Sequence, residues 1–366
     1  MKHIVQIVAD GDAGGGTTFV LGLISDMSKL DYRISLITAP DSYAYRQAVS
    51  AGIFVQGFDL FTSRLDLRLS GRLAELLASL SPDLVHVHGA RAAHPFTYGA
   101  LYETRFPVVY TVHGYHFLKK GCIGRLAGLM AERRIAHRVN HICFVSNGDL
   151  RIATSCSILG STASSVIYNG IDLSDVRSVK SRGPQYDLCF AGRMVPQKNP
   201  LFAIDVIKAL RDDSITLLMI GGGDLYDRAV SYASKQGVSN LIKFCGALSR
   251  QETLESIAQC RALLFPSLWE GLPLTPMEAM ALGVSVVASN IPGTNEIISH
   301  SECGVLIDDF EPLSYASEIR SLLRDEQKLH RVAHAGRRRI EDNFRREVCS
   351  EKYLDLYNQT LRYTSQ

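Results

Sequence analysis

Two glutamates, Glu270 and Glu278, stand eight residues apart in the segment Leu263–Gly283. An apolar, strand-like run ends just before Glu270, so this carboxylate is expected in a loop, while Glu278 falls in the apolar stretch that follows. A loop carboxylate could bind sugar hydroxyls or stabilise an oxocarbenium-like centre. Glu278 could accept hydrogen bonds from vicinal hydroxyls such as those of a ribose. The alternative is a buried structural pair of glutamates.

A short helix is expected between the two glutamates and would offer backbone donors. Thr275 precedes Pro276, and because threonine is a favoured N-cap and proline suits the first helical turn, the pair predicts a helix capped by Thr275. The N–H groups near Leu274 and Thr275 would then hold phosphate oxygens at the positive end of this helix.

Two bases, Arg193 and Lys198, follow a strand expected at 186–191. Pro200 comes two residues later and predicts the first turn of a helix. An arginine and a lysine at one strand end, close to a helix N-terminus, predict a site for a pyrophosphate.

Glycine-rich segments follow two further expected strands. One is Asp10–Thr18, which includes Gly15 and Gly16, and the other surrounds Gly222. Glycines let the backbone approach a ligand closely, and a helix start favours an anion. A dinucleotide fingerprint fits the first segment poorly because Phe19, where we expect the helix to begin, takes the third glycine position, and there is no P-loop Gly-Lys-Ser/Thr. A structural turn remains the alternative.

Four histidines lie at the ends of two strands that are expected to be neighbours, at 83–88 and 107–112. They are His86, His88, His113 and His116. A neutral imidazole can donate to a phosphate or hydroxyl, and its ordinary pKa suits proton transfer, although such histidines can also be satisfied packing residues. The histidines lack cysteine or carboxylate companions at zinc-ligand spacing, whereas Asp10 and Asp12 remain open as a divalent-metal pair.

All these residues follow short β-branched runs that alternate with amphipathic stretches, the pattern of parallel α/β sheets. Strands are expected near 3–9, 33–38, 53–58, 83–88, 107–112, 140–145, 164–168, 186–191, 214–220, 240–244, 261–265, 284–288 and 303–307. The stretch Asp172–Pro184 lacks an apolar run and predicts a linker, with a boundary near 170–184. From about Pro312 we expect helices, with Arg337–Arg339 and Arg345–Arg346 on a solvated face.

The composition suits a folded two-domain enzyme. The 366 residues are 46% hydrophobic and 21% charged, and 39 Lys+Arg against 37 Asp+Glu leave a net charge of +2. These values exclude disorder, a coiled coil and a polyanion binder, so no nucleic-acid partner is expected. Eight cysteines without a Cys-x-x-Cys pair suit a reducing cytosol. No apolar run approaches the ~18 residues of a spanning helix, and the first ten residues resemble a buried strand more than a signal peptide.

In their order and spacing, these motifs resemble a retaining glycosyltransferase of family 4. The resemblance covers almost the whole chain, and it includes Val166–Asp172 besides the segments above. It implies an α/β fold of the GT-B type, with two Rossmann-like, doubly wound parallel-sheet domains that face a central cleft. Residues 1–170 would bind the acceptor and residues 171–346 the nucleotide-sugar donor. A C-terminal helix at about 347–366 would dock back on the first domain.

The resemblance also implies roles for individual residues. It implies that His113 and Glu270 act in catalysis. It implies a donor diphosphate site formed by Arg193, Lys198, Leu274 and Thr275, and a ribose site at Glu278. Gly15 and Gly16 would form the loop near donor or acceptor, and Asn169 and Gly222 would lie along the cleft. The family usually holds no metal, and the nucleotide sugar is a substrate, so no cofactor is expected.

The expected activity is metal-independent transfer of a hexose or N-acetylhexosamine, with retention, from a nucleotide diphosphate sugar. We expect a UDP-sugar donor and a saccharide or lipid-linked saccharide acceptor in cell-surface polysaccharide synthesis (lipopolysaccharide, capsule or exopolysaccharide). A GT-B nucleotide-sugar epimerase and a non-catalytic nucleotide-sugar-binding subunit remain alternatives. The glutamate pair argues against the first, and the retained charged residues argue against the second.

One segment of this nearly neutral chain is strongly basic. Between Arg105 and Arg151 there are eight Lys/Arg and only two acids, Glu132 and Asp149. An amphipathic basic segment can lie on an anionic membrane surface, which would make a cytoplasmic protein peripheral on the inner face of the membrane. A core-facing helix with a charged outer face is the alternative.

Overall fold

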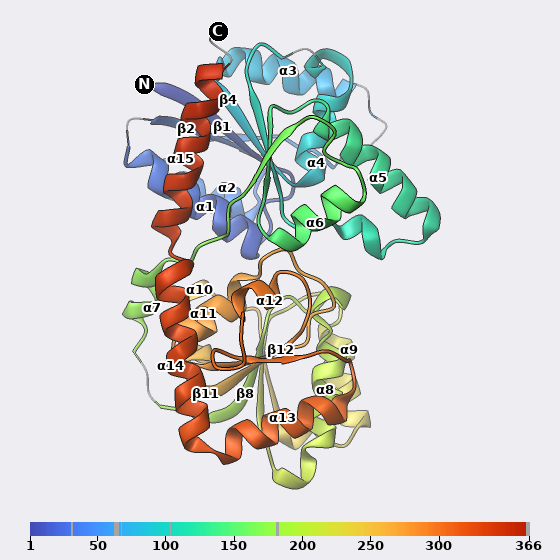
Figure 1. The fold of residues 1–366 in the computed structure, drawn as a ribbon, viewed down its shortest axis with the longest axis vertical. Helices are drawn as coiled ribbons and strands as arrows, with labels where there is room; N and C mark the ends of the chain where they lie inside the picture. Colours follow the sequence, from blue (N-terminus) through green and yellow to red (C-terminus); the bar gives the residue numbers. More distant parts are fainter. Residues whose placement is uncertain (31, 62–65, 67, 103, 181–182, 364–366) are drawn as a thin grey trace. The chain divides into compact units, whose positions relative to one another are not determined.

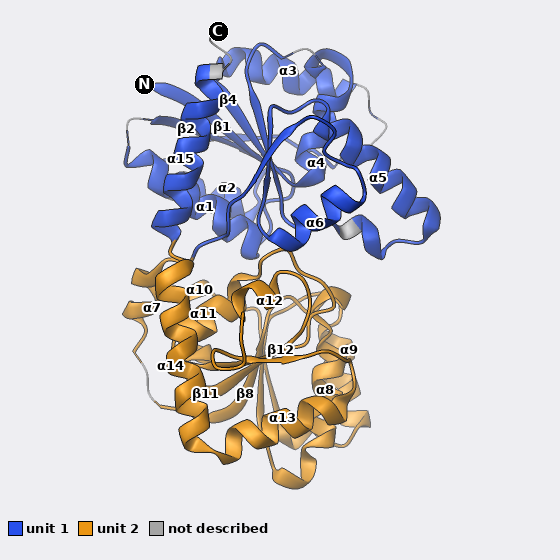
Figure 2. Ribbon diagram, viewed as in Figure 1, with its two compact units in different colours: residues 1–170, 346–366 blue, residues 171–345 orange. Residues whose placement is uncertain are grey.

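The computed structural model describes residues 1–366 except 31, 62–65, 67, 103, 181–182 and 364–366. The chain forms two compact units, which Figure 2 colours separately. Unit 1 consists of residues 1–170 and 346–366, and unit 2 of residues 171–345. Each has its own sheet and core, so each is described by itself.

Unit 1 contains a seven-stranded parallel sheet in the order β3-β2-β1-β4-β5-β6-β7. Its strands are β1 (Lys2–Val8), β2 (Tyr32–Thr38), β3 (Phe54–Gly57), β4 (Leu84–His88), β5 (Val108–Val112), β6 (His141–Phe144) and β7 (Ala163–Val166). Every residue of β4 and β5 is buried, as expected for central strands covered on both faces. The order reverses at β1 and β4, where a doubly wound sheet opens a ligand site beyond its strand ends.

Helices cover both faces of this sheet (Figure 1). They are α1 (Gly15–Ser28), α2 (Tyr43–Ser50), α3 (Arg68–Leu80), α4 (Gly89–Ala93), α5 (Cys122–Ala136), α6 (Asn147–Ser155) and α15 (Arg346–Tyr363). One core cluster lies beneath α3, α4 and α5, and the other beneath α1, α2 and α15. The chain's last helix therefore contributes to the core of the unit that contains its first strand.

Unit 2 contains a six-stranded parallel sheet in the order β10-β9-β8-β11-β12-β13. Its strands are β8 (Tyr186–Ala191), β9 (Leu217–Ile220), β10 (Ile242–Gly246), β11 (Cys260–Phe265), β12 (Ser285–Ser289) and β13 (Val305–Ile307). Its helices are α7 (Leu173–Ser178), α8 (Pro200–Ala209), α9 (Tyr226–Lys235), α10 (Arg250–Ile257), α11 (Leu274–Ala281), α12 (Thr294–Ile297), α13 (Pro312–Arg324) and α14 (Glu326–Asn343). Among the described residues, no helix of either unit is both long and apolar enough to cross a bilayer.

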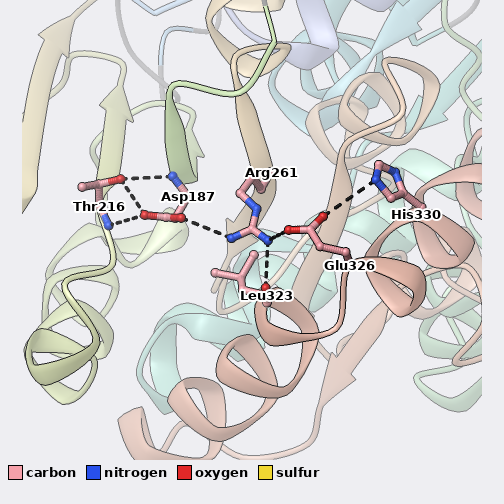
Figure 3. Close-up of polar contacts among 6 residues, drawn as sticks. All are labelled: Asp187, Thr216, Arg261, Leu323, Glu326 and His330. Atoms are coloured by element: carbon pink, nitrogen blue, oxygen red, sulfur yellow. Dashed lines mark hydrogen bonds and ion pairs between the residues drawn. The ribbon is translucent and has the colours of Figure 1, made fainter.

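A polar network fixes the starting ends of the strands in unit 2 (Figure 3). The Asp187 carboxylate on β8 accepts hydrogen bonds from the Thr216 N–H at 3.0 Å and the Thr216 hydroxyl at 2.9 Å. Arg261 on β11 lies 3.4 Å from Asp187, donates to the Leu323 carbonyl at 2.8 Å and pairs with Glu326. This network joins the amino ends of the strands to α13 and α14. The opposite edge, where the strands end, is left to the loops that carry the site.

The predicted two-sheet α/β fold is confirmed, and all thirteen expected strands are present. Their ends shift by up to three residues, as at β9, which begins at Leu217 rather than 214. The helix after the first strand was expected near Phe19, but α1 begins at Gly15. The Thr18 N–H already donates to the Gly14 carbonyl at 2.9 Å. Glycines are tolerated there because the first N–H groups of a helix need no helical partner.

Three further expectations about local structure are wrong. The predicted linker contains α7, because Asp172 caps it and its residues Leu173 and Val176 are buried. Helix α11 begins at Leu274 after an extended Pro273, so Thr275 is its second residue and not its cap. The arginines at 337–339 and 345–346 do not all lie on a solvated face, because Arg339 and Arg346 are only partly exposed.

Two of these arginines bind other elements. Arg339 on α14 donates to the carbonyls of Glu296 and Ile297. Arg346, at the start of α15, donates twice to the Asp26 carboxylate of α1, at 3.0 and 2.9 Å. Sequence periodicity cannot show such contacts because the partner of Arg346 lies 320 residues away.

Candidate functional site

An ion pair lies where β8 and β11 end in unit 2. The Lys198 Nζ atom is 2.6 Å from the Glu270 carboxylate, and the two side chains are only 15% and 8% exposed. Lys198 ends a short helical turn after β8, and Glu270 lies in the loop after the neighbouring strand β11. Gln197 donates to the Trp269 carbonyl at 2.9 Å and to Glu270 at 3.3 Å. The strand order therefore brings together two residues that the sequence predicts for the site.

Glu278 forms a second ion pair, on α11. It is buried and accepts from Arg250 at 2.5 Å, while Arg250 also donates to Asp175 at 3.0 Å. Burial opposes the charge of Arg250, but the ion pairs with Glu278 and Asp175 outweigh it and raise the pKa of the guanidinium. Glu278 is therefore held in one orientation by a base that stays charged.

Glycines allow the loops after β8 and β9 to pack backbone against backbone. Gly221 has φ +132°, and a Cβ atom there would lie 1.9 Å from the Gly192 carbonyl oxygen. The Gly222 carbonyl accepts from the Met194 N–H at 2.7 Å. Gly222 is thus placed against the loop that carries Arg193, whose side chain is exposed. Only residues without a side chain fit at this crossing.

The loops after β11 and β12 meet in the same way. Gly293 has φ +85°, and a Cβ atom there would lie 1.9 Å from the Gly271 carbonyl oxygen. Nearby in the chain, the buried hydroxyls of Ser267 and Thr294 have no hydrogen-bond partner among the described residues. Leaving such groups unpaired is costly, so they are candidates for contacts with a bound ligand. The start of α11, with Leu274 buried and Thr275 half-buried, follows this loop.

Unit 1 holds the predicted histidines. His88 ends β4, and His113 follows the neighbouring strand β5; His88 Nδ1 and His113 Nε2 are 3.2 Å apart. The ring of Phe19 on α1 packs edge-on against His113 with centroids 5.5 Å apart. His86 is buried, and burial followed by the neighbouring His113 lowers its pKa well below the usual range. The His116 side chain lies outside the described residues.

The remaining predicted residues of unit 1 are placed as follows. Gly15 and Gly16 are exposed in the first turn of α1, and a Cβ atom on Gly16 would meet nothing within 4 Å. Asn169 is buried just before the chain leaves the unit. Asp10 and Asp12 are exposed. Among the residues described, no group of three or more His, Cys, Asp or Glu side chains is placed to hold a metal ion.

The structure thus pairs Lys198 with Glu270 in unit 2 and places His88 beside His113 in unit 1. In unit 2, sequence reasoning missed two partners of the predicted residues: Gln197, which donates to Glu270, and Arg250, which donates to Glu278. Arg250 follows Ser249, which with Glu252 forms a capping box that is visible in the sequence. Its contact with Glu278, 28 residues later, leaves no periodic signal. In unit 1 the missed residue is Gln6, whose Oε1 atom lies 2.8 Å from His88 Nε2.

Two family models match the chain, one after the other. The model "Glycosyltransferase Family 4" matches residues 13–175, and the model "Glycosyl transferases group 1" matches residues 174–339. Their border falls at α7, within a few residues of the boundary between the two units.

Named relatives agree with these models. The glycogen synthase of Mycobacterium tuberculosis (strain H37Rv) is 28% identical over 334 residues, which cover 87% of this chain and 78% of the relative. A UDP-Gal:alpha-D-GlcNAc-diphosphoundecaprenol alpha-1,3-galactosyltransferase of Escherichia coli is 25% identical over 312 residues, 80% of this chain and 79% of the relative.

A solved structure agrees on the fold. HepE of Anabaena, in complex with UDP and glucose, superposes with a TM-score of 0.82 at 19% identity, covering 98% of this chain and 100% of HepE. With the two family models in tandem and two parallel-sheet units, the chain belongs to the group 1, family 4 glycosyltransferases of GT-B fold.

Proposed function

We propose that the protein transfers a hexose or N-acetylhexosamine from a UDP-sugar to a saccharide or lipid-linked saccharide, with retention and without a metal. The Lys198–Glu270 ion pair carries the proposal, because it sets a charged ammonium at the strand ends of unit 2 in a setting that largely excludes water. Unit 2 is the donor-binding unit in this proposal, and unit 1 binds the acceptor.

The chemistry requires stabilisation of a leaving diphosphate. The bond between the anomeric carbon and the diphosphate oxygen breaks, the acceptor oxygen bonds to that carbon on the same face, and the acceptor proton leaves with the diphosphate. Negative charge grows on the diphosphate, where Lys198 and Arg193 would bind it with the N–H groups of Leu274 and Thr275. A phosphate oxygen would then either replace Glu270 as the partner of Lys198 or bind the ammonium together with Glu270.

The other site residues complete this arrangement. Glu278, held by Arg250 at 2.5 Å, would accept the ribose hydroxyls, and Glu270 would lie beside the donor sugar. Gly222 would allow the nucleotide to approach the backbone, and Asn169 would contact the donor or the acceptor. In unit 1, His113 would lie next to the reacting sugar, and Gly15 and Gly16 would face donor or acceptor.

Similarity supports the choice of donor and acceptor. The E. coli relative is named for a UDP-galactose donor and a diphosphoundecaprenol-linked acceptor, and the HepE structure contains UDP and glucose. A lipid-linked acceptor would place this protein in cell-surface polysaccharide synthesis, at the cytoplasmic face of the membrane.

The test is a donor and product screen. Thermal shift would be measured with UDP-, GDP- and ADP-sugars, and products with lipid-linked acceptors would be identified by mass spectrometry and by the anomeric configuration in NMR. We expect stabilisation by UDP-sugars and a product that keeps the donor configuration. An epimerised sugar without transfer would support an epimerase, and binding without turnover a non-catalytic subunit. Stabilisation by no nucleotide diphosphate would contradict the whole proposal.

The membrane contact would be made by α5. Its exposed face carries Ile123, Leu126 and Met130, which are 88%, 59% and 48% exposed and share one side of the helix by their spacing. The flanking bases are Lys119, Lys120, Arg125 and Arg134. The opposite face is buried through Ile135 and Ala136. An exposed apolar stripe with a basic border suits an anionic lipid surface.

Vesicle binding tests this contact. Ile123→Asp is expected to lower binding to vesicles that contain phosphatidylglycerol at least tenfold, because it removes apolar area and adds a repelled charge. Leu313→Asp is the matched control, since Leu313 is 75% exposed on α13 of unit 2. Binding that is absent in the unaltered protein, or equal in both variants, would remove the membrane from the proposal.

A further inference from the structure

A buried chain of hydrogen bonds crosses unit 1 from α15 to His113. Gln6 on β1 donates from Nε2 to the Tyr357 hydroxyl at 3.0 Å. The Gln6 carbonyl oxygen, Oε1, lies 2.8 Å from His88 Nε2. His88 Nδ1 in turn lies 3.2 Å from His113 Nε2. Tyr357, Gln6 and His88 are 0%, 0% and 6% exposed, so water does not compete for these bonds.

The donors and acceptors in this chain have one consistent direction. An amide oxygen can only accept, so His88 must carry a proton on Nε2 in order to bond Gln6. A neutral His88 then has its lone pair on Nδ1 and can only accept from His113. The proton of that bond must therefore sit on His113 Nε2.

Burial keeps His88 neutral. Desolvation, followed by the neighbouring His86 and His113, lowers the pKa of His88 well below its usual range. The carbonyl oxygen of Gln6 carries no charge that would offset this effect. His88 thus remains an acceptor toward His113 at neutral pH.

A second set of hydrogen bonds starts at Tyr357 and passes through His86, whose ring lies against that of His88. The Tyr357 hydroxyl accepts from Gln6, so its own proton is available to His86 Nδ1 at 2.5 Å. His86 Nε2 then donates to the Thr111 hydroxyl at 2.7 Å. The rings of His86 and His88 are 4.0 Å apart, which leaves His88 little freedom to turn. His86 and His88 thus each use both ring nitrogens in hydrogen bonds while uncharged.

We propose that His88 is a positioning residue for His113, and that the chain from Tyr357 through Gln6 and His88 fixes both the orientation of the His113 ring and the nitrogen, Nε2, that carries its proton. This inference rests on the proposed role of His113 beside the reacting sugar. A histidine that meets a substrate presents a donor or an acceptor according to its tautomer, so a fixed tautomer decides which sugar group it can bind. The last helix of the chain thereby contributes to the active site without touching substrate.

The first test measures the proton directly. Full-length protein labelled with 15N-histidine would be examined by long-range 1H–15N NMR, with the His113 signals identified by their loss in His113→Asn. We expect His113 and His88 both to be neutral with the proton on Nε2. A proton on His113 Nδ1 would overturn the inference. This result does not depend on turnover, so it stands even if His113→Asn leaves sugar transfer intact and the proposed role of His113 fails.

The second test separates positioning from stability. His88→Phe removes the acceptor but keeps a ring, and we expect kcat to fall about ten- to a hundredfold with little change in donor KM, since a misplaced catalytic group costs this much. His88→Asn retains an acceptor near the Nδ1 position and is expected to recover at least half of that loss on a logarithmic scale. His3→Phe is the control, because His3 is also buried in unit 1 and its ring bonds Leu80 and Ser35, which belong to no proposed site.

The outcomes are distinguishable even if one variant folds poorly. Equal kcat for His88→Phe and His3→Phe, with both folded, would overturn a positioning role. Should His88→Phe not fold, the folded His88→Asn decides the question. Because its side chain retains an acceptor, a His113 proton that stays on Nε2 with kcat reduced less than about tenfold supports the proposal. A kcat that falls as far as expected for His88→Phe although the His113 proton stays on Nε2, with His3→Phe active and folded, overturns it.

Discussion

Lys198 lies in a setting that would penalise a lone ammonium. Only 15% of its side chain is exposed, and Glu270 at 2.6 Å balances its charge. Withdrawing a charge from water is tolerated only when a partner replaces the lost hydration, and Glu270 is that partner here. A diphosphate brings two negative charges to the same place and competes for the ammonium. In the proposed function, the diphosphate would therefore bind at the position that Glu270 occupies beside the ammonium.

Lys198→Ala is expected to lower kcat/KM about a hundredfold, because one well-placed donor to a developing charge contributes ~3 kcal/mol in the transition state. Steady-state kinetics with the identified donor would measure this. Lys208→Ala is the control, since Lys208 is exposed on α8 and bonds Gln236. Near-wild-type turnover by both Lys198→Ala and Arg193→Ala would contradict the assignment of the diphosphate site.

Glu132 shows a different consequence of burial. It lies on the inner face of α5, accepts from the Tyr110 hydroxyl at 3.1 Å, and its pKa is raised to about 7, mainly by desolvation. The folded protein then holds this proton at pH values where the unfolded chain, with an ordinary carboxyl pKa near 4.5, has lost it. Stability from this group is thus greatest below about pH 4.5 and declines until about pH 7.

Glu132→Gln is expected to remove this decline. Relative to the unaltered protein, its free energy of unfolding should rise by about 3 kcal/mol between pH 4.5 and pH 7 and stay level above, since each pKa unit corresponds to 1.36 kcal/mol. Urea denaturation along this pH range would show it. The difference from the unaltered protein isolates Glu132 from the buried histidines, and Glu255→Gln on an exposed site serves as control. A difference that does not change with pH would mean that folding leaves the pKa of Glu132 unshifted.

Whether the contacts of a residue could be predicted depends on how far away in the sequence its partners lie. Glu270 and Lys198 could be found from sequence because each follows an apolar run, and parallel strands align such ends at one edge of a sheet. The partner of Glu278 could not, because Arg250 reaches it from another helix. The bond between Gln6 and Tyr357 spans 351 residues and depends on where α15 docks. Only folding brings such polar pairs together.

At the scale of elements, strands were easier to predict than helix ends. Buried parallel strands give continuous β-branched runs, whereas a helix start depends on a few local hydrogen bonds. Helix α11 illustrates this, because the extended Pro273 lets it begin two residues before Pro276. The earlier start places the N–H groups of Leu274 and Thr275 in the first turn, where they need no helical partner.

Helix α15 is held to α1 by the Asp26 carboxylate, which binds two bases of different exposure. Arg346 makes two bonds at 2.9 and 3.0 Å with a side chain 20% exposed, and Lys29 lies 3.7 Å away at 67% exposure. The hydroxyl of Ser350 donates to the same carboxylate at 2.8 Å. Figure 1 shows α15 running beside α1. The half-buried pair should therefore matter far more than the exposed one.

Arg346→Ala is expected to destabilise unit 1 by about 1–3 kcal/mol, since it leaves the Asp26 carboxylate short of donors. Lys29→Ala, which removes the exposed partner of the same carboxylate, should change stability by less than about 1 kcal/mol. Thermal unfolding and the rate of protease cleavage within α15 would compare the two. Equal effects, or slower cleavage in Arg346→Ala, would contradict this account of how α15 is attached.

At the scale of the whole molecule, the chain builds one sheet, then a second, and returns to the first. Figure 2 shows the last helix in the colour of unit 1. Two separate cores imply that a ligand bound to one unit protects the residues of that unit in particular. Because the residues proposed for the nucleotide belong to unit 2 and the acceptor is proposed to bind unit 1, we expect nucleotide and acceptor to slow hydrogen exchange in different parts of the chain.

Hydrogen exchange of the full-length protein with and without UDP should reveal this division. We expect slower exchange in the loops after β8 and β9 and at the start of α11, because UDP at a hundred times its Kd stabilises the unit that binds it by about 2.7 kcal/mol. Lys198→Ala should need about a hundredfold more UDP for the same protection, and uridine, which lacks the diphosphate, should protect these loops least. Protection confined to the loops around His113 and the start of α1 would assign the nucleotide to unit 1 instead, because no donor residue proposed in unit 2 would then contact it.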